Sequence, residues 1–313
     1  MPLGSAADLP TRLTAAVGKA LRGKDDVVQL AVVTLLARGH LLIEDVPGVG
    51  KTTLARALAA CLGLTFRRLQ FTSDLMPTDV LGGNVFDRDK GEFVFRPGPV
   101  FTQLLLADEI NRTTPRTQSA LLEAMDEGRV SIDGVTHPLE EPFFVIATQN
   151  PQDFHGTYPL PESQLDRFLI RTEIGYPPPE VERAVLESRR TEGDPIAALE
   201  ATVTMDELQA AQAAVDEIRV EPLLLDYLHD LVLATRKSSL IEIGASTRAA
   251  LALERAVRAW ALVQGRDHVL PDDVKVLAEP VLAHRIRPVV SSEGRGDAKR
   301  AIRSVVDELS VPL

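Results

Sequence analysis

The stretch of sequence that decides the fold runs from residue 40 to residue 62 and reads HLLIEDVPGVGKTTLARALAACL. It begins with a short apolar run, His40 to Glu44, and passes through a turn of proline and glycine. From Lys51 to Leu62 the apolar residues recur at helical spacing. A strand, a glycine turn and a helix in this order are typical of a phosphate-binding loop, where backbone N–H groups and the helix N-terminus face phosphates. The stretch therefore predicts an α/β protein that binds a nucleotide.

The residues of this turn have separate expected roles. Gly48 and Gly50 let backbone N–H groups turn inward, and Lys51 reaches the β- and γ-phosphates. The Thr52 hydroxyl is expected to bind Mg²⁺. Asp45 stands where the pattern has glycine, so its carboxylate should face away from the phosphates to avoid like-charge repulsion. The residues expected to bind ATP or ADP are Val46, Pro47, Gly48, Val49, Gly50, Lys51, Thr52 and Thr53.

Other apolar runs are predicted to be buried strands of the same sheet. They lie at residues 65–71, 104–107, 143–148 and 168–174. Near-continuous apolar runs are typical of parallel strands that are covered on both faces. With the first strand they predict a three-layer α/β fold around a parallel sheet of five strands. A helix at 26–38 should precede the sheet and end at Gly39, because glycine tolerates the positive φ of a helix C-cap.

Two insertions interrupt this alternation of strands and helices. Residues 83–95 read as a hairpin with a loose tip, and residues 130–137 as a hairpin around Asp133-Gly134, a dipeptide typical of a tight type I′ turn. Between the two hairpins, a helix is predicted to start at Pro115 and to stop at Gly128.

The character of the chain changes at residues 176–179, because the three successive prolines that follow Tyr176 fit neither a helix interior nor a central strand. Beyond them the apolar residues follow helical spacing, and Thr204 with Glu207 forms a capping-box pattern. The predicted helices are 180–191, 205–218, 222–235, 247–264, 271–284 and 298–309. We therefore expect a nucleotide-binding domain over residues 1–176 and an all-helical lid domain over residues 180–313.

Two carboxylates directly follow the predicted strand at 104–107. The run ends in Asp108-Glu109. Beside a phosphate loop, Asp108 is expected to hold the shell of a Mg²⁺ ion, and Glu109 is expected to act as general base on the attacking water.

Further polar residues lie next to predicted strands. Asn150 is placed to position the attacking water, although an asparagine before Pro151 also commonly just turns the chain. Arg167 comes just before the last strand, at the far side of the sheet from the phosphate loop, and an ordinary surface arginine is the alternative. Arg112 and Arg116 follow the carboxylates closely, where either an intrasubunit ion pair or contact with a neighbouring nucleotide would suit them.

Together these features resemble the AAA+ ATPases and, within them, the MoxR family, over almost the whole chain. The most specific segments are EDVPGVGKT (44–52), ADEINR (107–112), ALLEAM (120–125), ATQNP (147–151) and GTYPLPE (156–162). The resemblance implies that Asn150 is sensor 1, that Arg167 is an arginine finger acting across a subunit boundary, and that Arg248, which ends the segment GASTR, is sensor 2. It also implies a hexameric ring with the two hairpins near its central pore.

Composition limits the other classes of function. The chain has 313 residues, with 45 acidic against 34 basic side chains and a net charge of −11, so as a whole it repels nucleic acid and anionic membranes. Cys61 is the one cysteine, which excludes an internal disulfide and favours a reducing cytoplasm. Because we find no apolar run typical of a signal peptide or a membrane span, we expect no stable membrane insertion.

From the residues and the resemblance we expect a magnesium-dependent ATPase that remodels or matures a protein client in a chaperone-like way. The resemblance implies a partner with a von Willebrand factor A domain, and insertion of a metal cofactor into the client. One alternative is the ATPase subunit of a magnesium-chelatase-like complex. Another, which the net charge disfavours, is a nucleic-acid motor or loader.

Overall fold

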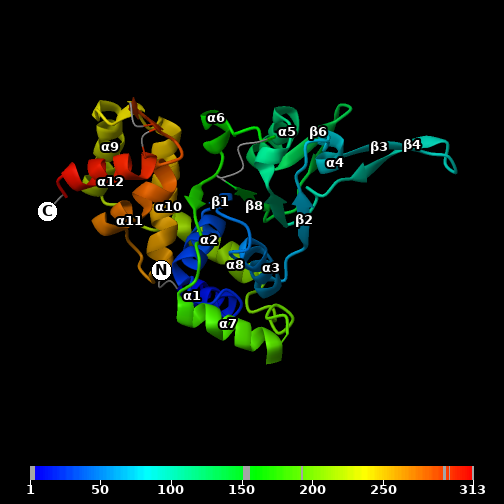
Figure 1. Ribbon diagram of the computed structural model, residues 1–313, viewed down its shortest axis with the longest axis horizontal. Coiled ribbons are helices and arrows are strands. Elements are labelled where there is room, and N and C mark those ends of the chain that lie inside the picture. The colour runs from blue at the N-terminus through cyan, green and yellow to red at the C-terminus, as the bar shows by residue number, and fades with distance from the viewer. Residues whose placement is uncertain (1–3, 151–155, 192, 292–293, 296, 312–313) are drawn as a thin grey trace.

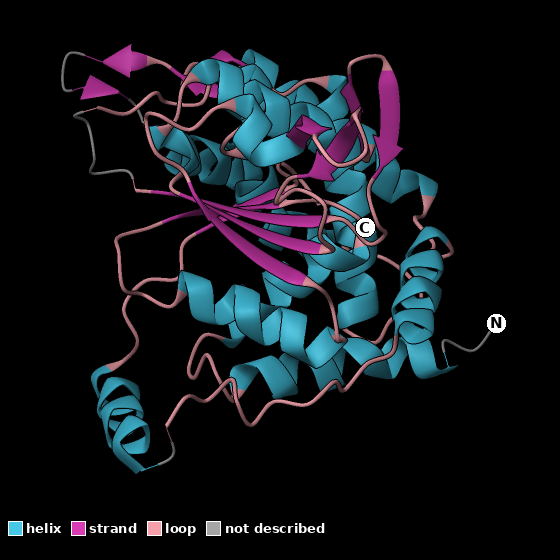
Figure 2. Cartoon of the chain, turned by 90° about the vertical axis from the view of Figure 1, so that its right-hand side faces the viewer, coloured by secondary structure: helices cyan, strands magenta, loops and turns pink. Residues whose placement is uncertain are grey.

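A parallel sheet of five strands, in the order β2-β5-β8-β1-β9, lies at the centre of the protein. The structure is a computed structural model that describes residues 4–150, 156–191, 193–291, 294–295 and 297–311. The five strands are β1 (Leu41–Glu44), β2 (Phe66–Gln70), β5 (Leu104–Asp108), β8 (Phe144–Gln149) and β9 (Ile170–Thr172). Helices lie on both sides of the sheet, as Figure 2 shows. The predicted three-layer α/β fold is therefore confirmed.

The two faces of the sheet pack against different helices, because successive side chains of a strand point to opposite faces. Leu41 and Ile43 belong to one apolar cluster, and Leu42 belongs to a second cluster with residues of α5 (Pro115–Glu127). The first cluster includes residues of three helices from the N-terminal part of the chain and of five helices from the lid. These helices are α1 (Gly4–Gly18), α2 (Asp25–Leu36), α3 (Lys51–Leu62), α8 (Met205–Asp216), α9 (Pro222–Lys237), α10 (Thr247–Val263), α11 (Pro271–Leu282) and α12 (Ala298–Glu308). One continuous core thus joins the sheet to helices from both ends of the chain, and the domain boundary at residues 176–180 stays a prediction.

Two local predictions about the sheet were wrong. Strand β2 is not buried: it is an edge strand on which Arg67 and Arg68 are exposed. The helix before β1, α2, ends at Leu36, and the positive φ that follows it belongs to Arg38, at 49°, and not to Gly39. A Cβ at Gly39 would come within 2.5 Å of the Leu169 side chain, so this glycine permits close packing of two segments. Helix α1, which contains Pro10, was not predicted at all.

The two predicted hairpins are present. Strand β3 (Gly82–Asp87) pairs with β4 (Glu92–Pro97), and β6 (Arg129–Ile132) pairs with β7 (Val135–Pro138). In Figure 1 the hairpin β3–β4 extends away from the body of the molecule. The two hairpins touch, since the ring of His137 stacks on Phe95 with centroids 3.9 Å apart and Asn84 donates a hydrogen bond of 2.7 Å to Asp133. Both Asp133 and Gly134 have a positive φ, as a type I′ turn requires.

The helical lid is also present. It contains α8 to α12, and α7 (Pro179–Thr191) follows the proline segment. The predicted capping box starts α8, with the Glu207 amide donating to Thr204 Oγ1 at 3.3 Å and the Thr204 amide donating to Glu207 Oε2 at 2.8 Å. Among the described helices, none combines the length and the hydropathy that a membrane span requires.

A few short elements complete the fold. Two unpredicted strand pairs lie among the lid helices, β10 (Ile241–Ile243) with β11 (Arg287–Pro288) and β12 (Val290–Ser291) with β13 (Gly294–Arg295). The remaining short helices are α4 (Pro77–Leu81), a 3-10 turn at Ile110–Arg112, and α6 (Glu162–Leu165).

Candidate active site

The phosphate loop connects the end of β1 to the start of α3. Gly48 has a φ of 89° and Gly50 a φ of 108°, conformations that a residue with a Cβ rarely adopts. Lys51 is the first residue of α3, and its Nζ donates a hydrogen bond to the backbone oxygen of Asp45. Burial lowers the pKa of the Lys51 amine, and the nearby carboxylates only partly oppose this shift. The lysine thus bonds back to the start of the loop, and the loop lies at the N-terminus of a helix, where an anion is stabilised.

The carboxylate of Asp45 faces away from the loop interior, as expected. Its Oδ1 accepts a hydrogen bond from the amide of Val46 at 2.7 Å. Its Oδ2 accepts from the amides of Ile174 and Gly175, at 2.7 and 2.6 Å. Three backbone donors thus compensate a buried negative charge, and the two from Ile174 and Gly175 tie the loop to the segment after β9.

Strand β5 delivers Asp108 and Glu109 to the same edge of the sheet. Thr148, near the end of the neighbouring β8, joins them: its hydroxyl donates to Asp108 Oδ1 at 2.6 Å and accepts from the Glu109 amide at 2.9 Å. Glu109 has a φ of 57°, a strained backbone conformation of the kind that often occurs at functional sites. Its carboxylate accepts a hydrogen bond of 2.6 Å from Gln70 and forms an ion pair of 3.0 Å with Arg112. Of the two roles predicted for Arg112, the structure thus shows the ion pair within the subunit.

A cavity of about 330 Å³ collects these groups at the carboxyl ends of the strands. Its lining residues are Pro47, Gly48, Gly50, Lys51, Thr52, Thr53, Arg68, Gln70, Asp108, Glu109 and Asn150. The structure therefore brings together most of the predicted loop residues, both carboxylates and the predicted asparagine. Of the other two loop residues, Val49 lines a neighbouring cavity and Val46 donates its amide to Asp45.

Three polar residues of this site were not predicted. Thr148 was within reach of sequence reasoning, since it ends a predicted strand and directly precedes Gln149 and Asn150; the structure pairs this strand with the one that carries Asp108. Arg68 and Gln70 belong to β2, which pairs with β5 so that Gln70 is the register partner of Asp108. No pattern in the sequence gives this strand order.

A second cavity, of about 480 Å³, adjoins the first and shares Pro47, Gly48, Gly50 and Thr53 with it. Its other walls are the turn after α1, between residues 19 and 24, the start of the proline segment at Tyr176 and Pro177, and side chains of α7, of which Val185 and Leu186 are apolar. The two cavities meet at the phosphate loop, so one ligand that places its phosphates in the first can extend into the second.

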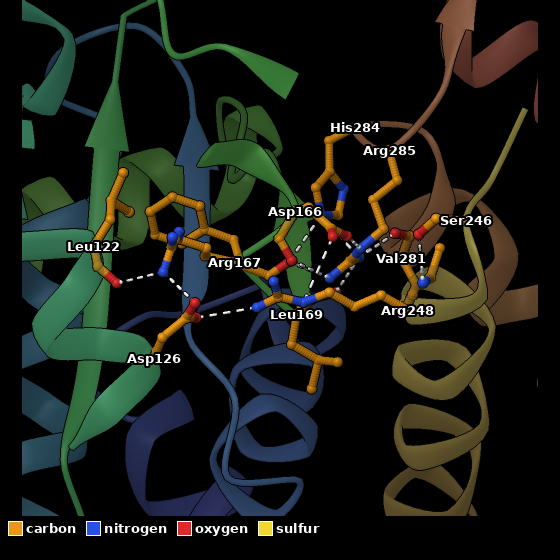
Figure 3. Close-up of polar contacts among 12 residues, drawn as sticks. Leu122, Asp126, Asp166, Arg167, Leu169, Ser246, Arg248, Val281, His284 and Arg285 are labelled. Atoms are coloured by element: carbon orange, nitrogen blue, oxygen red, sulfur yellow. Dashed lines mark hydrogen bonds and ion pairs between the residues drawn. The ribbon is translucent and has the colours of Figure 1, made fainter. Parts of the chain in front are cut away.

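Arg167 and Arg248 lie at the edge formed by the amino ends of the strands, opposite the edge that carries the phosphate loop. The amide of Leu169 donates to the backbone oxygen of His40, just before β1, which puts Arg167 beside the amino ends of the strands. Since a strand rises about 3.3 Å per residue, the two edges lie on the order of 15 Å apart. Figure 3 shows both guanidinium groups directed at Asp126 in α5. Arg167 Nη1 pairs with Asp126 Oδ2, and Arg248 Nη2 lies 3.1 Å from Asp126 Oδ1.

A buried arginine extends this cluster into the lid. Asp166 Oδ2 lies 3.5 Å from Arg248 Nε, and Asp166 Oδ1 accepts a hydrogen bond of 2.7 Å from Arg285 Nε. The Arg285 side chain, just after α11, is only 3% exposed. It also donates to the backbone oxygens of Asp166, Phe168 and Leu169 at 3.1, 2.7 and 3.0 Å. The lid therefore holds the backbone segment that leads into β9.

Several known proteins are similar to this chain in sequence and fold. The family model described as "ATPase family associated with various cellular activities (AAA)" matches residues 40–170, and the AAA lid domain model matches residues 233–305. The uncharacterised protein YeaC of Bacillus subtilis is 44% identical over 299 residues, which cover 95% of this chain and 93% of YeaC. Chaperone MoxR1 of Mycobacterium tuberculosis is 44% identical over 294 residues, covering 90% of this chain and 77% of MoxR1. The crystal structure of an inferred ATPase from Cytophaga hutchinsonii matches with a TM-score of 0.90 at 34% identity, over 99% of this chain and 97% of that one.

Proposed function

Because this chain belongs to the MoxR family of AAA+ ATPases, we propose that it couples magnesium-dependent ATP hydrolysis to the remodelling of a protein client as part of an oligomeric ring. The chain is an ATPase, and its relatives give it a chaperone-like function. The proposal of a ring rests on the distance between the phosphate loop and the two arginines, Arg167 and Arg248. The phosphate loop lies at one edge of the sheet, and Arg167 with Arg248 lies at the other.

The oxygen donors beside the phosphate loop fit a Mg²⁺ ion. Thr52 and Asp108 line the same cavity and offer a hydroxyl and a carboxylate. Mg²⁺ usually binds through one or two carboxylates, with water and phosphate oxygens completing its shell. When bound, the ion would neutralise part of the negative charge on the phosphates. We therefore assign Thr52 and Asp108 as the residues that hold it.

The other residues of the cavity divide the work of hydrolysis. Lys51 binds the β- and γ-phosphates, and the adenosine part of ATP occupies the second cavity. Glu109 takes a proton from the attacking water, as a carboxylate at the open end of the site can do. Asn150 orients that water with its side-chain amide. These assignments are supported by the common lining of one cavity.

We assign the two arginines, Arg167 and Arg248, to contacts with the phosphates of ATP that a neighbouring subunit binds. Their own phosphate loop lies at the other edge of the sheet, beyond the length of an arginine side chain. An arginine supplied by a neighbour stabilises the charge that develops on the phosphate oxygens in the transition state. Arg167 takes this role, and Arg248, which shares its aspartate partner, acts beside it.

The hairpin β3–β4 is the part of the chain that we assign to the client. Phe86 and Phe93 are 50% and 71% exposed on it, and aromatic side chains contribute strongly to protein contacts. The family resemblance suggests a hexamer with the hairpins near its pore, a partner with a von Willebrand factor A domain, and a client that receives a metal cofactor. The cytoplasm is the compartment that fits such clients and the single cysteine, Cys61.

The oligomeric part of the proposal can be tested by the rate of hydrolysis per chain at increasing protein concentration. If the active site is completed by a neighbour, this rate should rise steeply in the concentration range where mass photometry detects the oligomer. A rate per chain that is the same for monomers and oligomers would contradict completion of the site by a second subunit.

A further inference from the structure

Arg68 is a cation in the phosphate cavity to which the mechanism above gives no role. It comes from the edge strand β2, and its register partner in β5 is Leu106, two residues before Asp108. Arg68 Nε and Nη2 lie 3.1 and 2.6 Å from Asp108 Oδ2. Nη2 also donates to Gln70 Oε1 at 3.2 Å. The Arg68 side chain is 50% exposed and that of Asp108 is 13% exposed, so a half-exposed cation covers a mostly buried carboxylate.

Both oxygens of Asp108 have a partner in this arrangement. Oδ1 accepts from the Thr148 hydroxyl, and Oδ2 accepts from Arg68. A divalent cation next to Asp108 would share the carboxylate with a guanidinium of the same sign, and the two would repel each other. Arg68 therefore has to give up Oδ2 when a cation binds there.

A displaced Arg68 needs another anion within reach. The other carboxylate that lines the cavity, Glu109, already has contacts with Gln70 and Arg112. The terminal phosphate of ATP enters together with the cation, and the planar fork of a guanidinium matches two phosphate oxygens.

We propose that Arg68 exchanges partners during the ATPase cycle: it pairs with Asp108 in the nucleotide-free site and binds the terminal phosphate of ATP when nucleotide and cation enter. The exchange rests on the Mg²⁺ site proposed at Asp108, and it adds a catalytic residue that comes from the same chain as the phosphate loop. It has two separable consequences. Arg68 competes with the cation for Asp108, and it favours ATP over ADP because ADP lacks the terminal phosphate.

The test uses the full chain with Arg68→Gln, and Arg67→Gln as its matched control. Arg67 is the preceding residue of β2 and is also exposed, but its side chain points to the other face of the strand. Calorimetry gives the dissociation constants of ATP and ADP in excess Mg²⁺. A second titration, of Mg²⁺ into the complex of protein and ADP, isolates competition at Asp108 because no terminal phosphate is present.

In Arg68→Gln, ATP should bind roughly tenfold more weakly while ADP binding stays unchanged, as expected for loss of one charge-assisted hydrogen bond. Mg²⁺ should bind the ADP complex roughly two- to fivefold more tightly, because a half-exposed ion pair no longer competes. Arg67→Gln should behave as wild type in both titrations, and Arg68→Lys, which keeps the charge without the fork, should lie between. Circular dichroism should report the wild-type fold for all three variants, since both side chains are exposed.

Both shifts together support the exchange. Weaker ATP binding without tighter Mg²⁺ binding overturns it, because Arg68 would then not compete with the cation. Tighter Mg²⁺ binding with unchanged preference for ATP also overturns it, because Arg68 would then not reach the terminal phosphate. If the wild-type ADP complex binds no Mg²⁺, the metal assignment at Asp108 itself fails, and this result is recognised because it does not involve a variant.

Discussion

The carboxyl ends of the parallel strands form one edge of the central sheet and the amino ends form the other, and the charged residues are arranged differently at these two edges. At the carboxyl edge, acidic and basic side chains surround a cavity of about 330 Å³ next to the phosphate loop. At the amino edge, three arginines and two aspartates pair with one another in an alternating chain. Its members, in order, are Arg167, Asp126, Arg248, Asp166 and Arg285. The first edge thus has space for a ligand among its charged groups, whereas the cations of the second are already paired within the chain, and our proposal assigns Arg167 and Arg248 to the phosphate of a neighbouring subunit.

The largest effect should come from removing the cation that the amino edge offers to a neighbour. Arg167→Ala should lower the rate of hydrolysis by ~10³–10⁵, the usual contribution of an arginine finger, while ATP binding is kept. Mixing this variant with Lys51→Ala should restore part of the activity, because some interfaces then combine an intact phosphate loop with an intact arginine. Steady-state hydrolysis of the mixture measures this.

Crosslinking of the mixture provides the control for the mixing experiment, since it reports whether the two variants share rings. If they do and no activity returns, either Arg167 acts within its own subunit or every site of a ring must be competent. Full activity of Arg167→Ala alone would remove the finger assignment.

The next largest effect should come from the carboxyl edge. Glu109→Gln should lower turnover by ~10²–10⁴, because a glutamine amide cannot take the proton of the attacking water. It should still bind ATP, whereas Lys51→Ala should lose binding, since Lys51 contacts the phosphates in the ground state. Nucleotide binding and phosphate release, measured on both variants, separate the two roles. Hydrolysis by Glu109→Gln at the wild-type rate would contradict the general-base assignment.

A smaller effect should appear in the stability of the amino edge towards acid. His40 is buried there: its Nδ1 accepts from the Val145 amide at 3.1 Å, so its Nε2 donates to the Met125 backbone oxygen at 3.1 Å. Burial lowers the pKa of His40 from 6.5 to about 4, so between these values the unfolded chain binds a proton that the folded chain does not. The free energy of unfolding should therefore fall as the pH drops from 6.5 to 4, by about 3 kcal/mol from this residue.

Urea unfolding between pH 7 and pH 4 measures this dependence. Burial also lowers the pKa of His284, so both histidines act in the same direction and His40→Gln should flatten the pH profile only in part. An unchanged profile in His40→Gln would show that His40 is not the source of the acid sensitivity.

The smallest effect should come from the aspartate that holds two arginines at once. Asp126→Asn removes the charge that Arg167 and Arg248 share, and all three side chains are partly exposed. We expect a roughly fivefold loss of hydrolysis, in line with about 1 kcal/mol for such an ion pair. Glu127→Gln is the matched control, because Glu127 directly follows Asp126 but pairs with Arg129 instead of Arg167 or Arg248. Equal rates in the two variants would mean that Asp126 does not position the arginines.

The parts of the site that the sequence predicted are those that one short segment specifies by itself. The phosphate loop is such a segment, because its glycines, its lysine and its helix start follow one another directly. Asp108 and Glu109 are another, since two carboxylates at the end of an apolar strand must emerge at the carboxyl edge. The same holds for the turn at Asp133-Gly134.

The parts that were not predicted depend on packing between distant segments. Arg68 reaches the site only because β2 pairs with β5, and two arginines in a five-residue strand already depart from the apolar run of a buried one. Arg248 meets Asp126 across 122 positions of the chain. Gly39 was assigned to a helix end, although the close approach of Leu169, far along the chain, is what requires it.

The carboxylate of Asp45 has a mechanical consequence. Two of its three backbone hydrogen bonds fasten the start of the phosphate loop to Ile174 and Gly175, so these two pieces of chain should move together. Gly175, with a φ of 67°, is the last residue held in this way before Tyr176 and the prolines. We therefore expect a shift of the phosphate loop to be transmitted to the segment that leads into the prolines.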